Sequence, residues 1–188
     1  MSILLEVKNL QAFSREGHAL SPQISFNLEQ GEVLFLRGEN GAGKSTLLKT
    51  LLGLHPHYSG VFQFQTRPEK IQYLPQLGNL NFHLPMTLQD MLNGPGDSTL
   101  LKGLDLSKKW NTASGGERQK ILFTSVLQKS PQILFLDEPF NHVDKDACKL
   151  LEDSLGVYLK ENPQSALVLI SHRAIVQDWP RVRFVEIR

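Results

Sequence analysis

Eight residues near position 40 have the order of a loop that binds phosphate groups. Gly38 to Ser45 read GENGAGKS, which matches the pattern G-x-x-x-x-G-K-[ST]. Glycines let backbone N–H groups wrap around a phosphate, and a following helix adds its N-terminal dipole. In this pattern Lys44 reaches the β- and γ-phosphates, and the Ser45 hydroxyl is a ligand for Mg²⁺. The motif therefore predicts a site for a nucleoside triphosphate with Mg²⁺.

The segments on either side of this loop are those that the motif requires. Val33–Leu36 is a short, continuous apolar run, which is typical of a buried parallel strand. A helix beginning at Lys44 is predicted by leucines spaced along one helical face: Leu47, Leu48, Leu51 and Leu52. A glycine-rich turn that happens to precede a helix is the alternative interpretation, and the buried strand argues against it.

Two adjacent carboxylates follow a second buried strand, Ile133–Leu136. Parallel α/β sheets bind ligands at the carboxyl ends of their strands, so Asp137 is the natural second partner of the Mg²⁺. Glu138 points to the other side of the chain and could polarise a water for in-line attack on the γ-phosphorus. Alone, such a pair favours a solvated turn. A phosphate loop in the same chain favours the functional interpretation.

The remaining apolar patterns predict strands that alternate with helices. Leu4–Leu10 and Ile24–Leu28 alternate with period two and indicate an antiparallel sheet at the start of the chain. Further strands are expected at Val61–Gln65, Ile71–Leu74, Leu167–Ile170 and Val182–Ile187, and further helices at Gly115–Gln128 and Ala147–Leu159. Buried strands alternating with helices are typical of a parallel α/β core.

The overall composition argues against several other classes of protein. The 188 residues carry 20 Lys and Arg against 19 Asp and Glu, so the net charge of +1 gives no reason to expect nucleic acid or an anionic membrane as a partner. The single Cys148 excludes an intramolecular disulfide and fits a reducing compartment such as the cytoplasm. No run approaches the roughly 18–20 apolar residues of a membrane span, and no leader pattern is present, so we expect neither insertion nor secretion.

Further residues lie between and after these motifs in a characteristic order: Gln76 in YLPQ, Ser114–Gly116 in SGGERQ, Asp144, and His172 in SHR. Any one of them alone has an ordinary interpretation, such as an exposed amide, a helix N-cap or a surface histidine. Together with the phosphate loop and Asp137-Glu138, their order resembles the ATP-binding cassette (ABC) transporter ATPase family. The resemblance covers essentially the whole chain.

This resemblance implies a fold and a reaction. The expected fold is α/β, the ABC ATPase fold: a P-loop NTPase core with a parallel sheet, an N-terminal antiparallel β subdomain and a short helical insertion. We expect a single nucleotide-binding domain, residues 1–188, with the insertion at about 77–120. Residues 77–113 are fewer than the family's usual insertion, and 16 residues follow His172, so no accessory regulatory domain is expected. The expected reaction is hydrolysis of ATP with Mg²⁺ as cofactor.

The resemblance also assigns roles to individual residues. In this family two cassettes pack head to tail, so Ser114–Gly116 of one subunit would bind the γ-phosphate held by the phosphate loop of the other. Gln76 would sense the Mg²⁺ and the attacking water, and His172 would hold Glu138 and the γ-phosphate. Asp144 would lie at the dimer interface.

Phe13 occupies the position where the family offers an aromatic ring to the adenine, although a core phenylalanine at a strand end is an equal alternative. The residues expected to bind the nucleotide are Phe13, Gly38, Glu39, Asn40, Gly41, Ala42, Gly43, Lys44, Ser45, Thr46, Ser114, Gly115, Gly116 and Asp144. The expected Mg²⁺ partners are Ser45, Gln76 and Asp137, and the expected catalytic residues are Glu138, His172 and Gln76.

Three departures from the family's usual residues leave these phosphate-facing positions unchanged. Ala113 replaces a common Leu, Glu117 replaces the usual Gln, and Asn141–Asp144 read NHVD in place of SALD. They affect the expected packing of the dimer interface and the turnover rate, and not ATP binding.

The resemblance favours a transporter subunit that forms an ATP-dependent dimer, most simply a homodimer, and drives a separate membrane permease. Such a subunit is cytoplasmic and peripheral on the inner face of the cell membrane, and no nucleic acid is expected as a partner. Ile71–Gln76 and Phe82–Asp90 resemble the same region of zinc- and manganese-type importers. A haem-export cassette and a soluble ABC ATPase acting on ribosomes or DNA are the alternatives. A small-molecule kinase would leave Gln76, Ser114–Gly116 and His172 unexplained.

Overall fold

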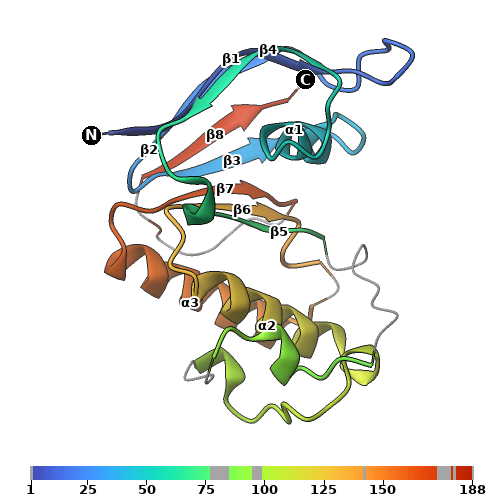
Figure 1. Ribbon diagram of the computed structural model, residues 1–188. Helices are drawn as coiled ribbons and strands as arrows, with labels where there is room; N and C mark the ends of the chain where they lie inside the picture. Colours follow the sequence, from blue (N-terminus) through green and yellow to red (C-terminus); the bar gives the residue numbers. More distant parts are fainter. Residues whose placement is uncertain are drawn as a thin grey trace.

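The computed structural model describes residues 2–76, 85–94, 99–141, 143–172, 179 and 181–187. Within these residues the chain forms two sheets and three layers (Figure 1). The smaller sheet is antiparallel, with the order β2-β1-β4. Its strands are β1 (Ile3–Ala12), β2 (Ile24–Glu29) and β4 (Tyr58–Phe64). The predicted antiparallel start of the chain is therefore confirmed.

The larger sheet is parallel and has the order β5-β6-β7-β3-β8 among the described residues. Its strands are β3 (Val33–Arg37), β5 (Ile71–Leu74), β6 (Ile133–Asp137), β7 (Ala166–Ile170) and β8 (Val182–Glu186). All residues of β6 and β7 are buried, as continuous apolar runs predict for strands covered on both faces. All these strands end at one edge of the sheet, which brings residues far apart in the chain together there.

The last strand differs from its predicted pattern. The alternation over Val182–Ile187 is typical of a strand with one buried face, but β8 is an edge strand in parallel pairing with β3, and four of its five residues are exposed. Its alternate apolar side chains pack only in part: Phe184 lies against the ring of Phe35, with centroids 5.3 Å apart, and remains 46% exposed.

The strand β4 begins three residues earlier than the sequence predicted. Its partner β1 carries a register shift between Lys8 and Gln11, where Asn9 has a φ of 52°. Gly60 lies opposite this bulge with a φ of 86°, and a Cβ there would lie 2.2 Å from the Asn9 carbonyl oxygen. The bulge interrupts the alternation of side chains, so Tyr58 and Ser59 carry no period-two signal although they pair with β1.

Helices cover both faces of the parallel sheet. Helix α1 (Lys44–Leu51) packs on one face together with the antiparallel sheet, which lies uppermost in Figure 1, and α2 (Gly115–Leu127) and α3 (Lys145–Glu161) pack on the other face, below β5 in the picture. Each face has its own buried cluster: Leu47 and Leu48 belong to the upper one, and Phe123 and Leu151 to the lower one. The α/β fold with a parallel core and an antiparallel subdomain is as predicted.

The described part of the segment before α2 contains short 3₁₀ turns. These are η3 (Gln89–Met91), η4 (Thr99–Leu101) and η5 (Trp110–Thr112), and a further turn, η1 (Pro68–Lys70), precedes β5. Trp110 anchors the segment to the lower core, where it is 1% exposed. The predicted insertion at about 77–120 overlaps the first half of α2, and its residues 77–84 and 95–98 lie outside the described residues.

Candidate nucleotide-binding site

The loop between β3 and α1 is shaped by glycines that no other residue could replace. Gly43 has a φ of 86°, and a Cβ on it would lie 2.1 Å from the carbonyl oxygen of Leu20. At Gly38, with a φ of 155°, a Cβ would lie 2.3 Å from the Ile187 carbonyl oxygen. Both contacts are with backbone atoms, which cannot move aside as a side chain can. The glycines therefore allow the loop to pack against its neighbours while its amides curve around a centre.

The positive charge of the loop lies inside it. Lys44 is 7% exposed, and its Nζ donates hydrogen bonds of 2.8 Å to the carbonyl oxygens of Gly38 and Glu39. A lysine that folds back over its own loop keeps its ammonium group within the loop, next to the N-terminus of α1. Phosphate oxygens are the ligands that suit this combination of amides and a cation.

The strand β6 brings a carboxylate to the start of α1. Asp137 is 2% exposed and accepts a hydrogen bond of 2.9 Å from the Ser45 hydroxyl, which lies 92 positions away in the sequence. It also accepts a hydrogen bond from Tyr73, and burial together with the Asp137 charge raises the pKa of the Tyr73 phenol. A hydroxyl and a carboxylate in contact are hard oxygen donors of the kind that Mg²⁺ prefers.

Glu138, the residue after Asp137, turns away from the Asp137 carboxylate. Glu138 has a φ of 49°, and its backbone N–H donates to the Ile170 carbonyl oxygen at 3.0 Å, so the chain bends sharply after β6. Its Oε1 lies 2.9 Å from Nε2 of His172. Burial raises the pKa of Glu138 above its ordinary value, the Asp137 charge adds to this, and His172 opposes it. The neighbouring carboxylates therefore face different partners, as the sequence predicted.

Lys44, Ser45, Glu138 and His172 line a cleft of about 520 Å³ at the carboxyl edge of the parallel sheet. The predicted residues that line it are Asn40, Gly41, Gly43, Lys44, Ser45, Thr46, Gln76, Glu138 and His172. The predicted site residues Gly38, Glu39, Ala42 and Asp137 are not part of its lining, although Asp137 contacts the lining residue Ser45. Leu20, Asn141 and Ile170 also line it and were not predicted as site residues. No motif signals Leu20 or Ile170, since each is brought there by the close approach of its backbone to the loop or to Glu138.

Other predicted residues lie outside this cleft's lining. Ser114 is the exposed N-cap of α2, and a Cβ on Gly116 would lie 3.4 Å from Oδ2 of Asp144, so this turn and Asp144 are neighbours. Asp144 is itself the N-cap of α3, where its Oδ1 accepts a hydrogen bond from the Ala147 N–H. Phe13 is half-buried at the end of β1 and also lies outside the lining.

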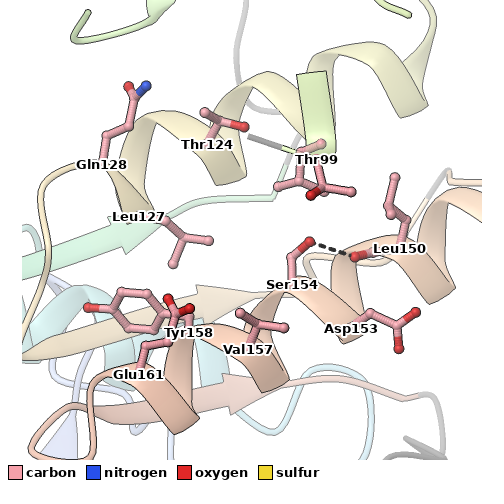
Figure 2. A pocket seen from close by; sticks show the side chains of 11 residues that line it. Thr99, Thr124, Leu127, Gln128, Leu150, Asp153, Ser154, Val157, Tyr158 and Glu161 are labelled. Atoms are coloured by element: carbon pink, nitrogen blue, oxygen red, sulfur yellow. Dashed lines mark hydrogen bonds between the residues drawn. The ribbon is translucent and has the colours of Figure 1, made fainter. Parts of the chain in front are cut away.

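A second hollow of about 590 Å³ lies between α2 and α3 (Figure 2). Its walls include Leu127, Leu150 and Val157, and the charged side chains that line it, Asp153 and Glu161, are acidic. No lysine, arginine or histidine is among its described lining residues. It is therefore unsuited to phosphate groups, although it is larger than the cleft at the sheet edge.

The described residues provide neither a membrane span nor a cluster of metal-binding side chains. In the ranges given above, no helix has the length and apolarity to cross a bilayer. In the same ranges, His, Cys, Asp and Glu nowhere gather in groups of three or more that could bind a metal ion.

A glycine loop with an enclosed lysine, between a buried strand and a helix, defines a P-loop nucleotide-binding protein when an aspartate from a second strand contacts it. Comparison with known proteins gives the family. The family model described as ABC transporter matches residues 22–141. The chain belongs to the ABC transporter family and is an ATP-hydrolysing cassette subunit of a transporter. The predicted family and ATPase activity are therefore confirmed.

Individual relatives match almost the full chain. It is 35% identical to the zinc import ATP-binding protein ZnuC of Photorhabdus laumondii, over 92% of this chain and 70% of that protein. It is 33% identical to the protein of the same name from Magnetococcus marinus, over 96% of this chain and 73% of that protein.

Solved structures share the fold. An ATP-binding subunit of an ABC transporter superposes with a TM-score of 0.80 at 24% identity, covering 98% of this chain and 85% of that one. A transporter assigned to the metal-chelate type, in an inward-facing conformation, superposes with a TM-score of 0.72 at 26% identity, covering 92% of this chain and 74% of that one.

Proposed function

We propose that ATP and Mg²⁺ bind in the cleft at the carboxyl edge of the sheet and that Glu138 is the general base for hydrolysis. The observation that carries this proposal is the contact of 2.9 Å between Glu138 and His172 beside the phosphate loop. Burial raises the pKa of Glu138, which makes it a better proton acceptor than an ordinary carboxylate. His172 orients this carboxylate and, with Lys44, faces the position of the γ-phosphate.

The residues present fit a Mg²⁺ ion. Ser45 and Asp137 offer oxygen atoms already in contact, and Gln76 lines the same cleft with an amide oxygen. When bound, Mg²⁺ would neutralise charge on the β- and γ-phosphates. Ser45 and Asp137 would hold it, and Asn40 to Thr46 would surround the phosphates with amides, hydroxyls and the Lys44 ammonium.

We infer that the working unit is a dimer in which a second copy completes each site. Ser114–Gly116 and Asp144 lie together but outside the lining of the cleft in their own chain. Ser114 is exposed at the N-terminus of a 13-residue helix, where backbone donors and the helix dipole favour an anion. The turn of one chain would therefore contact the γ-phosphate bound by the other. Phe13 would contact the adenine from outside the phosphate-binding part of the cleft.

We propose that this dimer works beneath a separate membrane permease and that its cargo is a divalent cation, Zn²⁺. Two relatives with over 90% of this chain aligned carry the name zinc import ATP-binding protein. The superposition on a transporter of metal-chelate type supports the same class. The protein would then lie on the cytoplasmic face of the membrane, held there by the permease.

Uptake of radioactive Zn²⁺ in cells that carry the gene tests this proposal. Deletion of the gene should lower Zn²⁺ uptake, and expression of the wild-type protein should restore it. Expression of Glu138→Gln at the same protein level should not restore uptake, because the variant lacks the proposed base. Uptake of radioactive Mn²⁺, measured in parallel, distinguishes a Zn²⁺ transporter from a Mn²⁺ transporter. Unchanged Zn²⁺ uptake after deletion would contradict zinc import.

Purification of the tagged chain in mild detergent should bring a polytopic membrane protein with it, and recovery without one would contradict the permease.

A further inference from the structure

The carboxylate of Asp137 accepts two hydroxyl hydrogen bonds, one on each oxygen. The Ser45 hydroxyl donates to Oδ1 at 2.9 Å, and the Tyr73 hydroxyl donates to Oδ2 at 3.3 Å. Ser45 belongs to the phosphate-loop motif, whereas no motif includes Tyr73 in the chemistry of the site. The longer distance makes the Tyr73 bond the weaker of the two. Between them the two donors restrict rotation of the carboxylate about its Cβ–Cγ bond.

The pairing of β5 with β6 explains why Tyr73 reaches this carboxylate. Tyr73 lies opposite Phe135, and Asp137 follows Phe135 by two residues. Side chains alternate along a strand, so Phe135 and Asp137 point to the same face of the sheet, and a long side chain reaches the diagonal neighbour. The Tyr73 ring packs against the upper core, to which Phe135 and the leucines of α1 belong. The ring is therefore fixed by packing, and its hydroxyl is directed at the site.

We propose that Tyr73 is a positioning residue for the Mg²⁺ site, in which its hydroxyl holds Oδ2 of Asp137 and thereby keeps Oδ1 turned towards Ser45. This inference rests on the proposed binding of Mg²⁺ and nucleotide in the cleft. Groups that orient a metal-binding carboxylate commonly change metal affinity by about tenfold or more when they are removed. Tyr73 lies near the end of β5, and Gln76, three residues later, lines the same cleft. The hydroxyl thus joins β5, which ends two residues before Gln76, to the carboxylate beside the phosphate loop.

A purely structural role makes a different prediction. If the ring only fills the core, phenylalanine serves equally well, since it keeps the same packing surface and removes one oxygen. If the hydroxyl positions Asp137, Tyr73→Phe weakens cation binding and leaves the binding of metal-free nucleotide unchanged, because the phosphates are still held by the loop and Lys44.

Binding of Mn²⁺, used as a stand-in for Mg²⁺, tests the proposal without turnover. Electron paramagnetic resonance of free Mn²⁺ gives the affinity of the full chain for the cation in the presence of ADP, and fluorescent ADP in EDTA gives the metal-free affinity. We expect Tyr73→Phe to weaken Mn²⁺ binding by about tenfold and to change metal-free ADP binding by less than twofold.

Tyr158→Phe is the matched control. Tyr158 is buried, whereas Tyr73 is half-buried, and the Tyr158 hydroxyl donates to the Pro131 carbonyl oxygen at 2.5 Å, at the opposite edge of the sheet from the cleft. This variant should bind Mn²⁺ as the wild type does. A Mn²⁺ affinity of Tyr73→Phe within twofold of wild type would overturn the inference, as would an equal loss of metal-free ADP binding. Failure of the wild type itself to bind ADP would instead overturn the proposed nucleotide site.

Discussion

The two halves of the proposed ATP site are built in different ways. On the phosphate-loop side, Ser45 and Asp137 meet from elements 92 positions apart, and Glu138 meets His172 across two strands. At the Ser114 turn the contacts are local: the Ser114 hydroxyl accepts from the Glu117 N–H at 3.2 Å, and the Glu117 carboxylate accepts from the Ser114 N–H at 2.6 Å. The first half depends on the packed sheet, and the second on one helix end.

This difference teaches where each half is vulnerable. Asp137 and Lys44 are buried, so loss of a partner leaves an unpaired charge in a buried position. Ser114 and Asp144 are exposed N-caps, and the hydrogen bonds that position them come from the first turns of their own helices. Buried Gln119 links the halves, because its Nε2 donates to the Pro139 carbonyl oxygen at 2.6 Å, directly after Glu138. Substitutions should therefore separate ATP binding, hydrolysis and dimer formation.

The largest effect is expected from Glu138→Gln. It removes the proposed base and keeps the size of the side chain, so the hydrolysis rate should fall by about 10²–10⁴-fold while ATP binding remains. Phosphate release and a fluorescent ATP titration measure the two quantities. A dimer that depends on ATP and Mg²⁺ should accumulate on a sizing column. Turnover at the wild-type rate would show that Glu138 is not the base.

The pH dependence of the wild type tests the same residue. Glu138 accepts a proton only when ionised, and burial raises its pKa, so the hydrolysis rate should fall with decreasing pH at a midpoint above the ordinary value of 4.5. His172 opposes this shift, so His172→Ala should move the midpoint to still higher pH. Initial rates at saturating ATP across the acidic range give both midpoints. A midpoint unaffected by His172→Ala would contradict an effect of His172 on the pKa of Glu138.

Lys44→Ala should weaken ATP binding by about 100-fold, because it removes a charge-assisted hydrogen bond worth about 1.5–3 kcal/mol and the cation at the centre of the loop. The same side chain bonds the carbonyl oxygens of Gly38 and Glu39, so thermal unfolding without nucleotide serves as the control for damage to the loop. Normal affinity with a normal melting temperature would contradict the assignment of the loop.

Ser114→Arg should affect the other half alone. Monomeric ATP binding should stay within twofold of wild type, because Ser114 lies outside the lining of its own cleft. The ATP-dependent dimer, measured in the Glu138→Gln background by sedimentation, should weaken by more than about tenfold, since a hydrogen bond to a charged group is lost and a bulky side chain is added. Equal loss of ATP binding would mean that Ser114 acts within its own subunit.

The smallest effect is expected from Lys108→Ala. Lys108 lies 2.8 Å from the Glu117 carboxylate and, together with hydrogen bonds from Ser114, lowers the pKa of Glu117 to about 2. The pair is partly exposed, so its loss should lower the free energy of unfolding by about 0.3–1 kcal/mol. This contribution should be present above pH 4.5 and vanish as the pH falls through about 2. Lys8→Ala, which breaks the more exposed pair with Glu6, is the control in urea unfolding.

Much of the fold was predictable because its signals are local. The glycines of the phosphate loop, the apolar runs of β3 and β6 and the cap at Ser114 each specify a conformation within a few residues. The unpredicted details arise from pairing: the early start of β4 depends on a bulge in its partner, and the exposure of β8 depends on its place at the sheet edge.

The sequence by itself determined which residues could do chemistry: the phosphate loop, the adjacent carboxylates at 137 and 138, and a histidine after a strand. Only the tertiary structure decided which of them meet. Parallel pairing brings the ends of β3, β6 and β7 to one edge, so Ser45 faces Asp137 and His172 faces Glu138. It also directs Tyr73 to Asp137. A diagonal contact between strands depends on their register, and it leaves no characteristic spacing of residues in the sequence.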